Sequence, residues 1–334
     1  MITALAAIFV FLLVVLLHEL GHFTIAKIVG IKVNEFAIGM GPKIFQSTKG
    51  ETQYTLRALP IGGFVRMEGE EEASTDPRSF QNASVWSRMA VIAAGSIMNF
   101  ILAIVVLSIV AFNVGVPSTT IEDIVPDSPA ETYGVLPGDT FRKINDVEIR
   151  SWDDIVNTIN KSTPGEAITI EIERNDSLIV LDVVPMQDGD RMVIGIYPAG
   201  ERNVLNSIKA GFEDTFYFIR LMFQFVGMLF AGQVSTNDLA GPIGVINEVG
   251  QAAKMGFNNL LLILGFISIN LGFFNLMPIP ALDGSKIVFL LIELVRGKPI
   301  DPDKEGFIHL IGFVFLISLM LLVTYKDLIK INIF

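Results

Sequence analysis

The sequence predicts a polytopic α-helical membrane protein with about four transmembrane helices, an inserted α+β domain and a short membrane-associated β-hairpin. Of its 334 residues 51% are hydrophobic and 18% are charged, and the mean hydropathy is +0.56. This composition is typical of membrane proteins and unlike that of soluble domains. Four apolar runs are long enough to cross the roughly 30 Å hydrocarbon core of a bilayer. Two of the polar stretches between them show the alternation of β-strands.

Charge and cysteine content exclude several function classes. The net charge of −11 argues against nucleic acid as a partner, because phosphate contacts require clustered Lys and Arg. The chain has no cysteine, so disulfides, Fe–S clusters and thiolate metal sites are excluded. Any metal must therefore be held by His, Asp or Glu.

The first span is predicted at residues 1–30. It lacks a basic leading segment and is longer than the apolar core of a signal peptide, so we interpret it as an uncleaved helix. Further spans are predicted at 89–114, at 258–284 and at 307–325. The region 203–257 is apolar but carries charges and aromatic residues, which favours an amphipathic region at the membrane interface. A fifth span at 204–232 is the alternative.

Basic residues predict the orientation of these spans. Lys and Arg are frequent in the loop 31–88 and in the segment 285–306, which are therefore expected on the cytoplasmic side. The long segment between the second and third spans is then extracytoplasmic, and so are both termini. A fifth span would break this parity.

The first span contains the motif His18-Glu19-Leu20-Gly21-His22. Histidines four residues apart on a helix are about 40° apart around the axis and one turn apart along it, so both can bind one Zn²⁺. Glu19 is then a candidate general base beside the metal. Ionisable side chains are costly inside a bilayer and indicate a functional site, although polar residues facing other helices are the alternative.

A catalytic zinc site needs a third protein ligand, and Asp283 is the strongest candidate. It follows two prolines in Asn275-Leu276-Met277-Pro278-Ile279-Pro280-Ala281-Leu282-Asp283-Gly284, and these forbid a regular helix. Broken backbone at membrane depth is tolerated where it is buried or lines a wet cavity. The alternative is that Asp283 caps the next helix. His309, in the last span, is interpreted as a packing residue.

The cytoplasmic loop 31–88 is predicted to contain a β-hairpin. Residues 51–67 are β-prone and are punctuated by Gly62 and Gly63, which precede Phe64. A hairpin near the active site would offer a strand edge that captures an unwound peptide by main-chain pairing. Gly62, Gly63 and Phe64 are therefore candidate substrate-positioning residues. A hairpin that packs on the helices and nothing more is the alternative.

The extracytoplasmic segment 117–198 is predicted to form a globular domain. Strand patterns at 120–125, 167–172 and 178–184 alternate with helical patterns near Ala130 and at 153–159. The order of Asp127-Ser128-Pro129-Ala130, Leu136-Pro137-Gly138-Asp139 and Ile144-Asn145-Asp146-Val147 resembles a bacterial, circularly permuted PDZ domain. The resemblance implies either peptide binding or a steric filter over the active site.

The paired motifs in the first and third spans resemble the site-2 protease family of intramembrane zinc metalloproteases, in its bacterial RseP/RasP-like group. The outer PDZ-like insertion and the stretch Gly241-Pro242-Ile243-Gly244 add to the resemblance, which covers essentially the whole chain. RseP has two tandem PDZ domains, whereas this chain has room for one. The resemblance implies a multi-pass protein of the cell membrane with its active site toward the cytoplasmic side.

The implied substrates are single-span membrane proteins, such as anti-sigma-factor-like regulators or remnant signal peptides, already cut by an upstream site-1-type protease. The implied ligands of Zn²⁺ are His18, His22 and Asp283, with Glu19 as the base. Asn275 is a candidate for positioning the substrate or the oxyanion, and helix packing is the alternative. Two other function classes stay open: a non-catalytic zinc-binding scaffold that acts through its PDZ-like domain, and a transporter.

Overall fold

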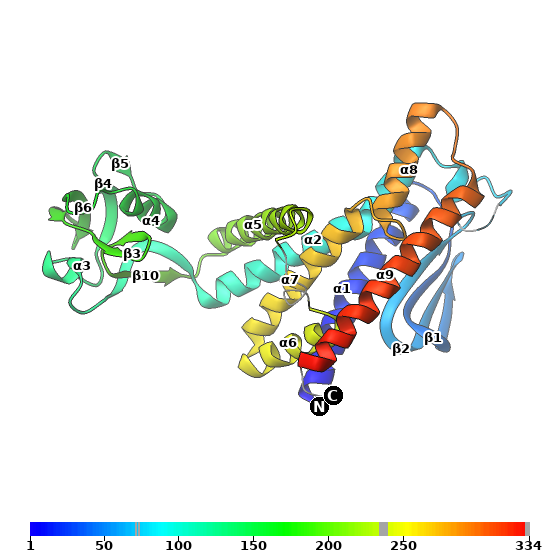
Figure 1. The fold of residues 1–334 in the computed structure, drawn as a ribbon, viewed down its shortest axis with the longest axis horizontal. Helices are drawn as coiled ribbons and strands as arrows, with labels where there is room; N and C mark the ends of the chain where they lie inside the picture. Colours follow the sequence, from blue (N-terminus) through cyan, green and yellow to red (C-terminus); the bar gives the residue numbers. More distant parts are fainter. Residues whose placement is uncertain (71, 73, 234–239, 331–334) are drawn as a thin grey trace. The chain divides into compact units, whose positions relative to one another are not determined.

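The protein is described by a computed structural model that covers residues 1–70, 72, 74–233 and 240–330. The chain divides into two compact units (Figure 1). The helical unit comprises Met1–Leu107 and Gly211–Phe334, and the α+β unit comprises Ser108–Ala210.

The helical unit is built from long helices and one β-hairpin. Its elements are α1 (Ile2–Ile28), β1 (Val33–Lys49), β2 (Thr52–Met67), a 3₁₀ turn (Phe80–Asn82), α2 (Val85–Val114), α5 (Val204–Phe230), α6 (Pro242–Met255), α7 (Phe257–Leu276), α8 (Asp283–Arg296) and α9 (Pro302–Lys330). α2 and α5 continue into the α+β unit.

Within the described residues, four helices are long and apolar enough to cross a membrane. They are Ile2–Ile28, Val85–Val114, Phe257–Leu276 and Pro302–Ile329. These helices fit a membrane protein. α5 has 27 residues but is not among the four, and its first turns carry the charges noted in the sequence.

The inward face of α1 is defined by small residues and by the two histidines. Its buried positions are Ala6, Ala7, Val10, Val14, His18, Gly21, His22 and Ala26, which follow the helical period. A Cβ at Gly21 would overlap the carbonyl oxygen of Ala94, so glycine lets α1 and α2 approach closely. This contact brings α2 against the two imidazoles.

α7 also packs on α2. The Ser268 hydroxyl donates a hydrogen bond of 2.8 Å to the backbone oxygen of Asn99. A Cβ at Gly272 would lie 3.0 Å from the backbone oxygen of Ser96, so a larger residue would push the two helices apart by a few tenths of an ångström. α2 thus packs on both α1 and α7, which also contact each other.

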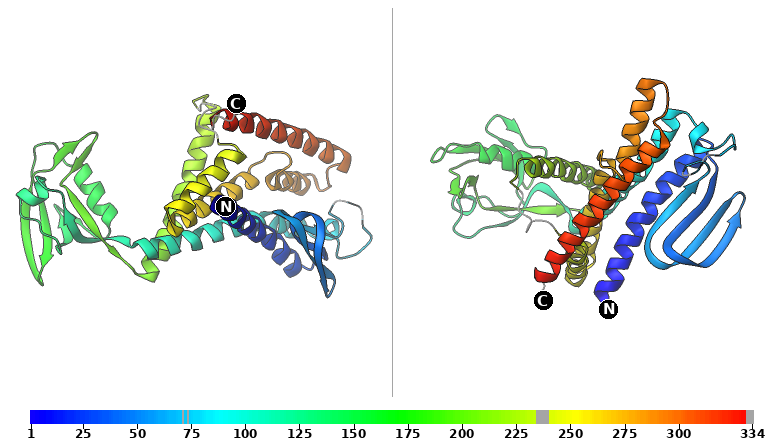
Figure 2. Two further views of the ribbon diagram at one scale, coloured as in Figure 1. Left: turned by 90° about the horizontal axis from the view of Figure 1, so that it is seen from below. Right: turned by 45° about the vertical axis from the view of Figure 1, so that its right-hand side comes forward.

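The hairpin packs on α1 (Figures 1 and 2). The ring of Phe23 lies 5.2 Å from that of Phe36 and 6.0 Å from that of Tyr54. β1 and β2 are long and bent, so residues 35–38 have partners on two stretches, 53–56 and 63–66. The stretch 63–67 is therefore an edge, and no further strand pairs with it in the described chain. The sequence located strand signal at 51–67 but missed β1, whose Gly39, Gly41 and Pro42 weaken the β pattern.

The centre of the hairpin is polar. Glu35 is 1% exposed, and its carboxylate accepts hydrogen bonds from Thr55 (2.7 Å), Arg57 (2.8 Å) and Arg66 (2.5 Å). Burial alone would raise the pKa of Glu35, but the hydrogen bonds from Arg57 and Thr55 outweigh it and lower the pKa below its ordinary value. This carboxylate links the stretches that the bend brings together.

The α+β unit has one six-stranded sheet with the order β10-β3-β4-β6-β7, and β5 pairs with β4. Its elements are β3 (Val116–Ile124), α3 (Pro129–Thr132), β4 (Thr140–Ile144), β5 (Val147–Glu148), α4 (Trp152–Asn160), β6 (Ile168–Arg174), β7 (Ser177–Val183), β8 (Met186–Asp188), β9 (Arg191–Val193) and β10 (Ile196–Glu201). β8 and β9 form a separate two-stranded hairpin.

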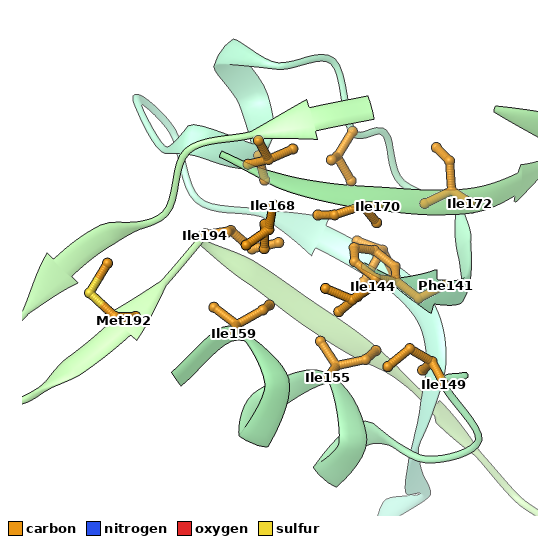
Figure 3. Close-up of a cluster of buried hydrophobic side chains, with 14 residues drawn as sticks. Phe141, Ile144, Ile149, Ile155, Ile159, Ile168, Ile170, Ile172, Met192 and Ile194 are labelled. Atoms are coloured by element: carbon orange, nitrogen blue, oxygen red, sulfur yellow. The ribbon is translucent and has the colours of Figure 1, made fainter. Parts of the chain in front are cut away.

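The core of this unit is almost entirely aliphatic (Figure 3). Ile155 and Ile159 project from α4 toward Phe141, Ile144 and their neighbours on the sheet. A capping box between Ser151 and Asp154 begins α4. The buried Asp139 is held by Arg174, with Nε–Oδ1 and NH2–Oδ2 distances of 2.7 Å. The fold of this unit fits the predicted PDZ-like domain.

Candidate active site

The structure brings His18, His22 and Asp283 together. The Nε2 atoms of the two histidines are 3.2 Å apart. The Oδ2 atom of Asp283 lies 3.3 Å from Nε2 of His18 and 3.4 Å from Nε2 of His22. These three atoms form a nearly equilateral triangle. Among the described residues, His18, His22 and Asp283 form the cluster of His and acidic side chains that has the geometry of a metal site.

The break after α7 is what delivers Asp283 to this triangle. α7 ends at Leu276, and the proline-containing segment leads directly into α8. The N-cap of α8 is Leu282, and Asp283 is the first helical residue, so the capping alternative is wrong. The carboxylate turns toward α1 instead. A Cβ at Gly284 would overlap the backbone oxygens of Leu276 and Met277, so the next residue must be small.

α2 fixes the orientation of His22. Nδ1 of His22 lies 2.8 Å from the backbone oxygen of Val91 and donates to it, because a carbonyl can only accept. The lone pair of the neutral ring is then on Nε2, which faces the triangle. A Cβ at Gly95 would overlap Nε2 of His22, so the imidazoles need a glycine at this point of α2.

Asn99 makes the corresponding contact with His18. Its side-chain amide nitrogen lies 3.2 Å from Nδ1 of His18, and its amide oxygen is buried without a partner among the described groups. The amide O and N are assigned from the hydrogen-bond network, and exchanging them places the oxygen at Nδ1. The oxygen then accepts from Nδ1–H, and Nε2 of His18 keeps its lone pair for the triangle.

Glu19 lies between the histidines and the hairpin edge. Its carboxylate is within electrostatic reach of His18, His22 and Asp283. A Cβ at Gly63 would lie 3.3 Å from Cγ of Glu19 and 2.8 Å from the backbone oxygen of Ala37. The hairpin edge therefore passes directly beside the candidate base at Gly63.

The other candidate positioning residues lie in different places. The side-chain nitrogen of Asn275 is 3.5 Å from Nε2 of His18, at the end of α7. Phe64 stacks under the guanidinium of Arg57 at 4.8 Å and lines a cavity of about 540 Å³. Gly62 has φ +81 and packs on Met40, so it shapes the bend of β2 and does not approach the triangle.

Two ion pairs hold α8 in place. Arg88 of α2 binds both carboxylate oxygens of Glu293, at 2.5 and 3.1 Å. Nζ of Lys286, one turn after Asp283, lies 2.9 Å from Oε1 of Glu70 in the segment that follows β2. The helix that begins with Asp283 is thus linked both to α2 and to the polypeptide after the hairpin.

Sequence reasoning missed the contribution of α2. Val91, Gly95 and Asn99 recur at intervals of four on one face of the helix, and each contacts a histidine. A usable signal was present, because an asparagine in an otherwise apolar span is costly and indicates a buried polar contact.

Comparison with known proteins identifies the family. The model of peptidase family M50 matches residues 6–319. The chain belongs to peptidase family M50, the site-2 protease family. A Clostridium acetobutylicum relative whose name assigns it as a zinc metalloprotease is 41% identical, over 97% of this chain and 96% of its own. The zinc metalloprotease RasP of Bacillus licheniformis is 36% identical, over 98% of both chains.

The regulator of sigma-W protease RasP of Bacillus subtilis is 34% identical to this M50 chain, over 98% of both chains. A solved PDZ domain of an SdrC-like protein from Listeria monocytogenes aligns at 20% identity over 26% of this chain and 88% of its own. The TM-score of that alignment is 0.21, which is too low to support an argument. The description of the α+β unit as PDZ-like is therefore based on its own strands and helices. Membership of the family makes the chain a zinc metalloprotease and decides against the scaffold and the transporter.

The triangle fits the zinc ion that the M50 family requires. Tetrahedral zinc with bonds of about 2.0–2.1 Å to nitrogen and oxygen needs donor atoms roughly 3.3–3.5 Å apart. The observed separations of 3.2, 3.3 and 3.4 Å match this requirement. The donor set, two neutral imidazoles and one carboxylate, leaves a fourth position open, as in catalytic zinc sites.

Proposed function

We propose that this protein is an intramembrane protease in which His18, His22 and Asp283 hold the zinc ion and Glu19 is the general base. The observation that carries the proposal is the triangle of Nε2, Nε2 and Oδ2 atoms with edges of 3.2–3.4 Å, formed by α1 and by the start of α8 after the helix break. When bound, zinc would act as a Lewis acid that polarises the scissile carbonyl and lowers the pKa of water.

The residues around the triangle divide the remaining work. The Glu19 carboxylate takes a proton from the attacking water and delivers it to the nitrogen of the leaving amine. The amide of Asn275, 3.5 Å from His18, donates to the oxygen on which negative charge develops. Val91 and Asn99 keep both imidazoles in the orientation that presents Nε2 to the triangle.

The hairpin edge is proposed to hold the substrate in an extended form. A transmembrane helix must unwind before cleavage, because its peptide bonds are otherwise enclosed in backbone hydrogen bonds. The unpaired side of the stretch 63–67 offers replacement partners by β-addition, next to Glu19. Phe64, beside a cavity, is placed to contact a substrate side chain.

The substrates proposed are single-span membrane proteins, already shortened outside the membrane by another protease. They include anti-sigma-factor-like regulators or remnant signal peptides, consistent with the name of the Bacillus subtilis relative, regulator of sigma-W protease. The distribution of Lys and Arg favours a cell-membrane orientation with both termini and the α+β unit outside and the active site toward the cytoplasm.

Replacing the base tests the proposed chemistry. Glu19→Gln keeps the size of the side chain but cannot accept a proton, so we expect cleavage to fall by at least about a hundredfold. Zinc content should stay at one ion per chain. Glu248→Gln, the same change at an exposed position of α6, is the matched control. Substantial proteolysis by purified, zinc-loaded Glu19→Gln would rule out this role.

Deleting the PDZ-like domain tests whether it filters substrates by size. Val116 and Glu201 are strand partners, so residues 116–201 can be replaced by a short linker without leaving an unpaired strand. We expect the variant to cleave trimmed substrates normally and to accept substrates that keep a bulky outer domain. Loss of cleavage of a trimmed substrate would favour peptide binding by the domain instead.

A further inference from the structure

The segment between α7 and α8 contains one backbone conformation that its sequence does not favour. Ala281 has φ +76. The other described non-glycine residues with positive φ are Asp127, Asn145, Asn175 and Asp176. Asn and Asp tolerate this region through local hydrogen bonds, whereas alanine pays the steric cost of its Cβ without such compensation. Something outside the segment must therefore hold Ala281 in place.

α9 provides that contact through His309. The backbone N–H of Ala281 donates to Nδ1 of His309 at 3.0 Å. Nδ1 must be unprotonated to accept, so the ring proton is on Nε2. This nitrogen is buried without a hydrogen-bond partner among the described groups and lies 3.8 Å from Oε1 of Glu305. The ring packs edge-on against Phe289 of α8 with centroids 5.5 Å apart. His309 is thus oriented by the N–H of Ala281 and by the ring of Phe289, and it is not merely a packing residue.

A second contact places α9 on the same bend. Gly312 is one helical turn after His309, and a Cβ there would overlap Pro280. The glycine lets α9 approach the proline closely enough for His309 to reach the next residue. Two independent positions of α9 therefore fit two consecutive residues of the segment.

The position of the bend determines the position of Asp283. Ala281 is two residues before it, and α8 begins at Asp283 itself. If Ala281 returned to negative φ, the direction of the chain entering α8 would change. Oδ2 of Asp283 must stay 3.3–3.4 Å from both histidine nitrogens to complete the triangle, and sites of this kind tolerate errors of about 0.5 Å.

We propose that His309 is a positioning residue for the zinc site: by accepting the N–H of Ala281, it holds the bend that aims Asp283 at His18 and His22. The inference rests on the proposed function, in which Asp283 is the third ligand. It assigns to α9, which contributes no atom to the triangle, a role in metal affinity that acts through the position of Asp283.

The test measures zinc affinity of purified full-length protein by competition with a chromophoric chelator, together with the d–d absorption of the Co²⁺-substituted form. His309→Leu removes the acceptor, and His309→Phe removes it while keeping an aromatic ring against Phe289. His309→Asn restores an acceptor at nearly the same place, because its side-chain oxygen replaces Nδ1. Phe315→Leu, at an exposed position of α9, is the control.

We expect His309→Leu and His309→Phe to bind zinc about 10- to 100-fold more weakly, with an altered Co²⁺ spectrum. His309→Asn should recover most of the affinity and the wild-type spectrum. Ala281→Gly should also reduce the loss caused by His309→Leu, because glycine adopts positive φ without steric cost. Thermal unfolding of the zinc-free proteins shows whether His309→Leu or His309→Phe keeps the wild-type fold. The variant that keeps it is used to compare zinc affinities.

Asp283→Ala, measured in parallel, separates this inference from the proposed function. If Asp283→Ala binds zinc as tightly as wild type, the ligand assignment itself fails. If Asp283→Ala loses zinc but the His309 variants do not, the positioning role alone is wrong. Failure of His309→Asn to improve on His309→Leu would equally overturn it, because the acceptor would then not matter.

Discussion

The two β-containing parts of this protein differ in what holds them together. The α+β unit has its own core, in which Phe141, Ile144 and Ile170 are fully buried. The hairpin β1–β2 has a buried carboxylate at its centre, and it exposes large apolar side chains at Met40, Ile44, Phe45, Leu56 and Leu59. One is a domain that carries its own stability, and the other depends on α1.

The contacts of the hairpin place it beside the candidate base. Phe36 and Tyr54 pack on Phe23, one residue after His22, and Gly63 passes beside Glu19. Any rearrangement of the hairpin therefore acts on the helix that carries the candidate base. The core of the α+β unit shares no residue with these contacts. The membrane association of the hairpin stays a prediction from the sequence.

Truncating the core of the α+β unit should give the largest effect on stability and none on the site. Phe141→Ala is expected to destabilise this unit by about 3–5 kcal/mol, since a fully buried ring is lost. Trp152 packs against this core, so its fluorescence in a Trp86→Phe background reports the melting. Zinc affinity and cleavage of a trimmed substrate should be unchanged.

Val147→Ala, at an exposed position of the same unit, is the control and should melt as wild type does. If Phe141→Ala abolished zinc binding as well, the independence of the two parts would be disproved.

A smaller change in the hairpin should lower catalysis and leave the stability of the α+β unit unchanged. In Gly63→Ala the new Cβ lies 2.8 Å from the backbone oxygen of Ala37 and 3.3 Å from Cγ of Glu19, so the edge or the base must shift. Displacement of a catalytic group by about 1 Å costs roughly a hundredfold in rate. We expect kcat to fall by about that factor while zinc content and the melting of the α+β unit stay constant.

Gly227→Ala is the matched control, because a Cβ at that position meets no atom within 4 Å. Wild-type turnover by Gly63→Ala would show that the edge strand can move away from Glu19 without consequence.

Acid should loosen the hairpin before it affects the aliphatic core. The folded-state pKa of Glu35 is below its ordinary value, so its contribution to stability is complete above that value. This contribution is lost as the pH falls through the lowered pKa, because protonation removes the acceptor of Arg57 and Arg66. We expect increased hairpin mobility below about pH 4.

The chain has no cysteine, so a spin label at Thr48→Cys reports on the hairpin alone. Glu35→Gln should be more mobile at neutral pH and should lack the acid transition. A transition that persists in Glu35→Gln would mean that another carboxylate controls the hairpin.

The sequence by itself determined the class of protein and half of the candidate site. Apolar runs of sufficient length specify spans because backbone hydrogen bonds must be satisfied inside a bilayer. The helical period places His18 and His22 on one face, so their pairing needs no tertiary information. The two prolines before Asp283 also indicated a break, since proline cannot continue a helix.

Tertiary structure alone decided which groups surround that pair. Sequence spacing carries no information on how α2 packs, so the contacts of Val91, Gly95 and Asn99 with the imidazoles were not predicted. The same holds for His309. A lone histidine in an apolar span suggests a packing residue, and only the structure shows that Ala281 lies beside it. These contacts arise where helices distant in sequence approach closely, and small residues such as Gly21 and Gly312 permit that approach.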